Sequence, residues 1–89
     1  MKPDIEAVWG RIEARAGEAF TQVRGARFTY RVAGGHVVPD RTVQQIPRSH
    51  FARALELVPL SGPGEVQNLR GPSYIFAILM DPRVRAGEW

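Results

Sequence analysis

Apolar and polar residues alternate most clearly in the segment 27–33, which reads RFTYRVA. Successive side chains of an extended chain point to opposite faces, so the pattern predicts a strand with an apolar inner face and an outer face of arginine and threonine. Gly34-Gly35 supplies the positive φ angles that a tight hairpin needs, and residues 36–39 return after it. Residues 20–24 form a weaker β-prone run before the turn at Gly25. We expect three antiparallel strands, at about 20–24, 27–33 and 36–39.

A second pattern, with apolar residues three and four positions apart, predicts helices on both sides of these strands. In the segment 5–16 the apolar residues fall on one helical face, and Asp4 is placed to cap the start. The segment 50–58 repeats the pattern, with Ser49 as its expected cap and Pro59 as its end.

The apolar run from Tyr74 to Met80 fits either a helix or a buried strand, because its length suits both. Gly71-Pro72-Ser73 before it resembles a helix start with proline at the first position, which favours the helix. We expect this short helix to end at Asp81-Pro82 and residues 83–89 to form a loose tail.

The resulting order of elements predicts one small α+β domain over residues 1–89. It has an N-terminal helix, a three-stranded antiparallel meander and two further helices, the second short and buried. We expect the helices 5–16 and 50–58 to cover one face of the meander. In the connection 40–48, Val43 and Ile46 are expected to reach the core.

Composition narrows the function classes. Of the 89 residues, 44% are hydrophobic and 24% charged, as in ordinary globular domains. No apolar run approaches the roughly 18–20 residues of a membrane span, so we expect no membrane partner. The chain has no cysteine, and its first residues lack the basic flank and apolar core of a signal peptide. These features favour a cytoplasmic location.

Positive charge is concentrated in the middle of the chain. Residues 19–55 contain six arginines and one acid, Asp40, a net charge of +5, whereas the rest of the chain sums to −2. On the outer face of the predicted hairpin this charge could bind the phosphates of DNA or RNA. The candidate nucleic-acid-binding residues are Arg24, Arg27, Thr29, Arg31, Arg41, Arg48 and Arg53, with His50 beside the last two.

No residue pattern indicates catalysis. His36 and His50 have no nucleophile in a recognisable motif, and their spacing matches no metal-ligand pattern. We therefore expect no enzymatic activity, no cofactor and no metal. Arg70 precedes the expected helix start at Gly71-Pro72-Ser73, and two interpretations of this segment are open. It is either a separate anion-binding site or a plain turn in which Arg70 forms a salt bridge.

Two hypotheses remain open. The first is a small nucleic-acid-binding or nucleic-acid-associated domain that contacts phosphates through a basic sheet face. The second is a non-catalytic protein-interaction module or accessory subunit, including a homodimer. In that case the apolar 74–80 segment or the edge of the meander would bury against another chain.

Overall fold

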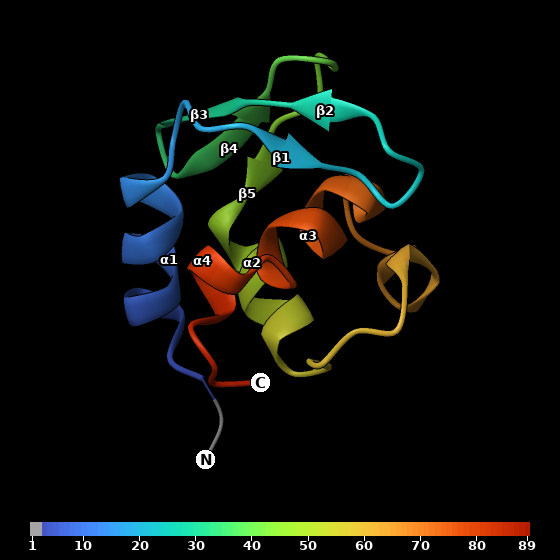
Figure 1. The fold of residues 1–89 in the computed structure, drawn as a ribbon. Helices are drawn as coiled ribbons and strands as arrows, with labels where there is room; N and C mark the ends of the chain where they lie inside the picture. The colour runs from blue at the N-terminus through green and yellow to red at the C-terminus, as the bar shows by residue number, and fades with distance from the viewer. Residues whose placement is uncertain (1–2) are drawn as a thin grey trace.

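A layer of short strands lies over a group of helices (Figure 1). The computed structural model describes residues 3–89. The helices are α1 (Ile5–Ala14), α2 (Arg48–Leu55), α3 (Pro72–Leu79) and α4 (Pro82–Arg85). A 3-10 turn, η1 (Pro63–Val66), lies between α2 and α3. The strands are β1 (Phe20–Thr21), β2 (Arg27–Phe28), β3 (Tyr30–Ala33), β4 (His36–Pro39) and β5 (Ile46–Pro47). The predicted α+β fold class is confirmed.

The expected meander is divided into two antiparallel sheets, β1-β2 and β3-β4-β5. The predicted strand 27–33 is interrupted at Thr29, because the backbone N–H and carbonyl of Thr29 are hydrogen-bonded to Asp40. The Thr29 N–H donates to Asp40 Oδ1 at 3.0 Å, and the Thr29 carbonyl accepts the Asp40 N–H at 2.9 Å. The strand expected at 20–24 ends at Thr21, since the Gln22 N–H and carbonyl already close the hairpin turn. The strand at 36–39 is confirmed.

The first helix begins as predicted, with Asp4 accepting a hydrogen bond from the Glu6 N–H at 3.2 Å. The second predicted helix, 50–58, is shifted toward the N-terminus: α2 runs from Arg48 to Leu55. Ser49 is not its cap, since the chain enters the helix directly from β5 and the Arg48 N–H donates to the Gly35 carbonyl. The 74–80 run is helical, so the strand alternative is wrong.

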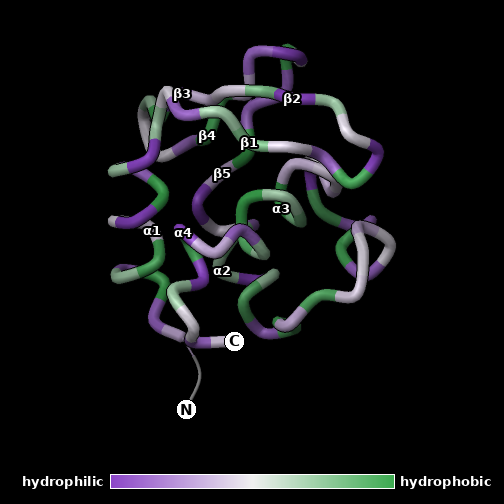
Figure 2. The backbone as a smooth tube through the Cα atoms, viewed as in Figure 1, coloured by the Kyte–Doolittle hydropathy of each residue, from purple (hydrophilic) through white to green (hydrophobic). Residues whose placement is uncertain are grey.

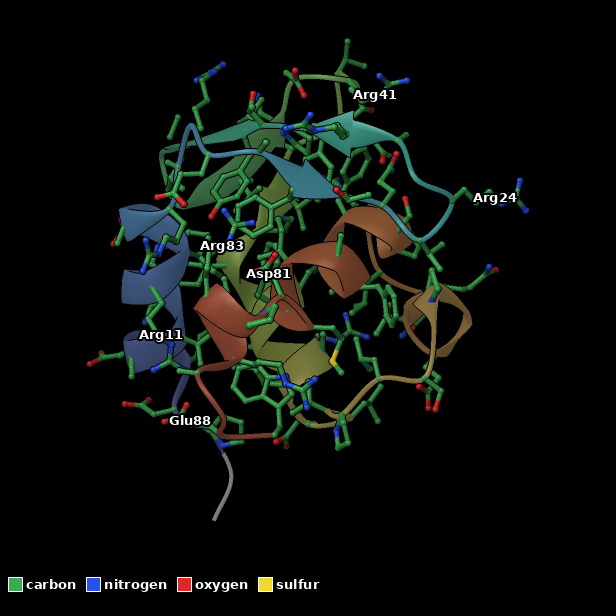
Figure 3. All side chains as sticks on the ribbon, viewed as in Figure 1. Arg11, Arg24, Arg41, Asp81, Arg83 and Glu88 are labelled. Atoms are coloured by element: carbon green, nitrogen blue, oxygen red, sulfur yellow. The ribbon has the colours of Figure 1, made fainter. Side chains whose placement is uncertain are left out.

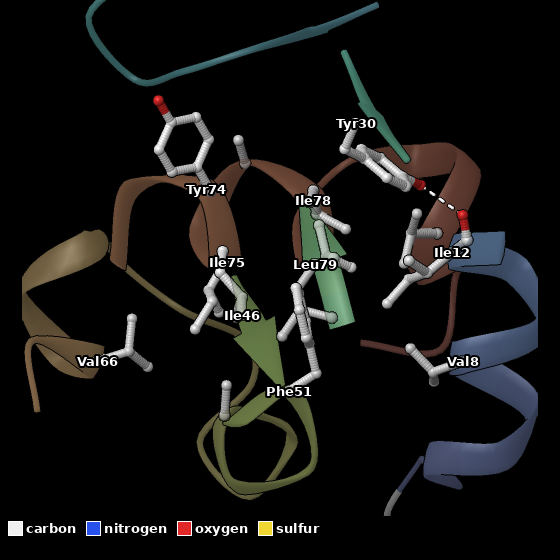
Figure 4. Close-up of a cluster of buried hydrophobic side chains, with 14 of the residues drawn as sticks. Val8, Ile12, Tyr30, Ile46, Phe51, Val66, Tyr74, Ile75, Ile78 and Leu79 are labelled. Carbon is white, nitrogen blue, oxygen red and sulfur yellow. Dashed lines mark hydrogen bonds between the residues drawn. The ribbon is translucent and has the colours of Figure 1, made fainter. Parts of the chain in front are cut away.

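The core lies between the β layer and the helices, and α3 is at its centre (Figure 4). Hydrophobic positions concentrate along α3 and recur on one side of α1 (Figure 2). Five of the eight residues of α3 are buried within this chain, so the segment 74–80 is not a free apolar surface, and of the two surfaces that the interaction hypothesis offered the edge of the meander remains. Ile46 reaches the core as expected, but Val43 is 97% exposed at the tip of the β4–β5 loop.

The segment expected to be a loose tail forms a packed element instead. Asp81 Oδ1 caps α4 by accepting the Arg83 N–H at 2.9 Å, and Val84 is fully buried. The Arg11 side chain donates to the Val84 carbonyl at 2.7 Å, and the Trp89 indole N–H donates to the Leu79 carbonyl at 2.9 Å. These contacts join sequence-distant residues, which local pattern does not reveal.

Gly71, the residue before α3, offers a sharp test of this packing. Its φ is +55°, and an added Cβ would lie 2.8 Å from Cδ1 of the fully buried Ile46. We expect Gly71→Ala to lower the free energy of unfolding by about 2–4 kcal/mol, from left-handed strain and overpacking together. Gly10→Ala, in the exposed middle of α1 with open space around it, should raise it by roughly 0.5–1 kcal/mol. Urea unfolding measures both, and equal effects would contradict the packing described.

The ion pair between Asp81 and Arg83 should make stability depend on pH. Hydrogen bonding to Arg83 lowers the pKa of Asp81, so the stabilisation is complete above the unfolded-state pKa near 3.9 and is lost as pH falls below it. Asp81→Asn keeps a capping side chain but removes the charge. We expect this substitution to lower the free energy of unfolding by about 1 kcal/mol at pH 7. At the lowest pH at which the protein folds, the free energy of unfolding should hardly change. The matched change Glu13→Gln, which removes a carboxylate from the exposed side of α1, is the control in the same unfolding experiment.

Candidate nucleic-acid interface

The strands position two of the predicted arginines by simple alternation. Phe28 and Tyr30 are 2% and 3% exposed, whereas Arg27 and Arg31 beside them are exposed to solvent. Arg27 lies opposite Thr21 in the β1-β2 register, and Arg31 lies opposite Val38 in β3-β4. The β layer therefore has an aromatic inner side and a cationic outer side, as the sequence pattern predicts.

Loops place two more arginines at the border of the same layer. Arg24 lies at the tip of the β1–β2 hairpin, where Gly25 adopts a φ of +93°, and Arg41 is the second residue of the β4–β5 loop. Both side chains project away from the helices (Figure 3). We call Arg24, Arg27, Arg31 and Arg41 the arginine face.

The four guanidinium groups of the arginine face have no carboxylate partner among residues 3–89. Most arginines of the helices do have one. Arg11 is 2.5 Å from Glu88, and Arg83 lies within 3.0 Å of both Glu18 and Asp81. Asp40, the acid nearest in sequence to Arg41, directs Oδ1 to the Thr29 N–H. The arginine face is thus open to an external anion.

Thr29 has a different role from the one expected. Its side chain is half-buried and its backbone is held by Asp40, so it supports the bend between β2 and β3. A shallow hollow of about 230 Å³ lies here, lined by Ala19, Arg27, Phe28, Thr29 and Asp40. Because the Asp40 carboxylate lies in its wall, the hollow itself does not suit a phosphate.

Arg48 and Arg53 lie apart from the arginine face, in the helical part of the fold. Arg48 opens α2 and is 3.9 Å from Glu6 of α1. Arg53 is in the last turn of α2 and is exposed. The single surface expected from the sequence is therefore divided between the strands and α2.

Sequence reasoning missed two features of this region. Val23 and Val43, beside Arg24 and Arg41, are 60% and 97% exposed, although valine in a β-prone run usually indicates a core position. The second missed feature is a contact between His50 and Arg70, which sequence reasoning considered separately. The Arg70 N–H donates to His50 Nδ1 at 3.0 Å. Residues 20 positions apart give no local signal of such a contact.

The described residues contain no group of side chains that suggests a metal site. Within residues 3–89 no three His, Asp or Glu side chains are grouped so as to hold a metal ion. His36 Nδ1 is 2.9 Å from the Gly34 carbonyl and is thus occupied in the hairpin turn. Over the same residues, no helix is both long enough and apolar enough to cross a bilayer.

Comparison of the chain with models of protein families, with characterised proteins and with solved structures finds no match.

Proposed function

We propose that this domain binds nucleic acid by placing the arginine face against the phosphate backbone. The observation that supports the proposal is that Arg24, Arg27, Arg31 and Arg41 are exposed and lack carboxylate partners in the described part of the chain, whereas Arg11, Arg15 and Arg83 are paired. Guanidinium groups suit phosphate oxygens because their N–H groups can donate two parallel hydrogen bonds.

The aromatic residues favour backbone contact over base stacking. Sheet proteins that bind single strands stack bases on exposed aromatic rings. Here Phe20, Phe28 and Tyr30 are at most 3% exposed, and the Tyr30 hydroxyl donates to the Ile12 carbonyl at 2.6 Å. We therefore propose binding of low sequence specificity, to DNA or RNA, by a protein that acts in the cytoplasm and performs no catalysis.

A second candidate function is docking of a protein partner or a second copy on the same side. The exposed side chains of Val23 on the β1–β2 loop and Val43 on the β4–β5 loop favour it, because a partner that covers them would remove apolar surface from water. Light scattering at high concentration distinguishes self-association from a monomer.

Removing the two strand arginines tests the nucleic-acid proposal. We expect the double variant Arg27→Gln and Arg31→Gln to weaken duplex binding at low salt by about 5–30-fold, as the loss of two exposed charge contacts. The slope of log K against log salt should become shallower by about 2, since each phosphate contact contributes roughly 1. Fluorescence anisotropy with a labelled duplex, repeated over a salt series, measures both quantities.

The matched control is Arg15→Gln, because this exposed guanidinium is already 3.4 Å from Glu18. Its affinity and its salt slope should equal those of the wild type. A wild-type protein with no affinity at low ionic strength would refute the proposal. Equal losses in the control and the double variant would refute the assignment to the arginine face.

A further inference from the structure

A second group of cationic side chains gathers where α2 meets the turn that precedes α3. The contact that forms it is a hydrogen bond from the Arg70 N–H to His50 Nδ1, 3.0 Å long. His50 and Arg53 are three residues apart in α2, so their side chains lie on the same side of the helix. We call His50, Arg53 and Arg70 the α2 cluster.

The α2 cluster has no anion of its own in the described residues. Arg53 and Arg70 are both exposed, and neither forms an ion pair within residues 3–89. One nitrogen of Arg70, Nη1, is 3.4 Å from the Gln45 carbonyl, which turns the guanidinium toward the β4–β5 loop and leaves its other N–H groups available. Two unpaired positive charges therefore flank one imidazole.

The hydrogen bond fixes which imidazole nitrogen carries the proton. Because Nδ1 accepts from the Arg70 N–H, the neutral ring must carry its hydrogen on Nε2, which then acts as a donor. Partial burial, followed by the charges of Arg53 and Arg70, lowers the pKa of His50, so the ring is neutral at pH 7 and keeps this arrangement. The α2 cluster thus presents N–H donors from three side chains and no acceptor.

We propose that the α2 cluster is a binding site for a phosphate dianion, either free or at the end of an organic monoester. A phosphate group with three terminal oxygens can accept hydrogen bonds from three side chains that surround it, and its double charge matches the two guanidinium groups. The internal phosphodiester of a nucleic acid has fewer free oxygens and a single charge, so it fits the open row of the arginine face better. This inference is independent of nucleic-acid binding by that face.

Titration with inorganic phosphate at pH 7.5 and constant ionic strength, followed by ¹H–¹⁵N NMR, tests the site. We expect a saturable shift of the Arg70 backbone amide and of the His50 ring nitrogens. Arg53→Gln and Arg70→Gln should each weaken phosphate binding by about two- to fivefold, as for the loss of an exposed charge contact. Both residues are exposed, so the variants should keep the wild-type spectrum elsewhere.

The matched control is Arg15→Gln, an exposed arginine that lies 3.4 Å from Glu18 and belongs to neither proposed site, and it should leave phosphate binding unchanged. A shift that grows linearly without saturating would overturn the proposal. So would a shift spread equally over Arg24 and Arg41, or equal binding by the wild type and both α2 variants.

A second arm identifies the source of the phosphate. A trinucleotide with a 5′-phosphate is compared with the same trinucleotide ending in a 5′-hydroxyl. Tighter binding of the phosphorylated form, lost in Arg53→Gln, supports a terminal monoester as ligand. Saturable binding of inorganic phosphate with no gain from the 5′-phosphate supports a small free phosphate instead. Tighter binding of the hydroxyl form to the α2 cluster would overturn the preference for a dianion.

Discussion

The need to bury most of the surface of α3 determines the rest of the architecture. Ile75, Ile78 and Leu79 are fully buried, and the rings of Tyr74 and Phe28 form a T-shaped pair with centroids 4.9 Å apart. A helix that is apolar all round is stable only when other elements enclose it. The strands enclose α3 from one direction, and α2, α4 and η1 enclose it from others (Figure 1). The strands therefore direct their aromatic residues inward, which leaves their arginines on the outside.

The arginines fall into two groups according to their surroundings. Those at the joint between α1 and α4 are bound to neighbouring carboxylates or carbonyls, and Arg83 also lies over the Phe20 ring, 4.0 Å from its centroid. They hold the C-terminal helix in place. Arg53 and the arginines of the arginine face have no carboxylate partner in the described residues. Arg48 is 3.9 Å from Glu6, and Arg70 contacts the Gln45 carbonyl but no carboxylate. Composition alone does not separate the two groups, because separating them requires knowing which acids come close in the folded chain.

Much of the fold could be predicted because its signals are local. The helix after Asp4, the hairpin at Gly34-Gly35 and the helix after Pro72 depend on residue types within a few positions of one another. The errors occur where distant contacts decide the structure. Asp40 interrupts the strand at Thr29, the Arg48 N–H bonds to Gly35 instead of a Ser49 cap forming, and Val84 is buried beneath α1. The candidate sites follow the same rule. Alternation predicts that Arg27 and Arg31 face outward, whereas the meeting of His50 with Arg70 depends on tertiary packing.

The C-terminus lies on the side away from the strands, next to the first described residue, Pro3 (Figure 1). Pro3 and Trp89 line the same hollow, and Trp89 is anchored there by its indole N–H. A tether attached after Trp89 would therefore leave from the helical side of the molecule. Immobilised on a surface or fused to another domain by such a linker, the protein would keep its β layer turned toward the solution.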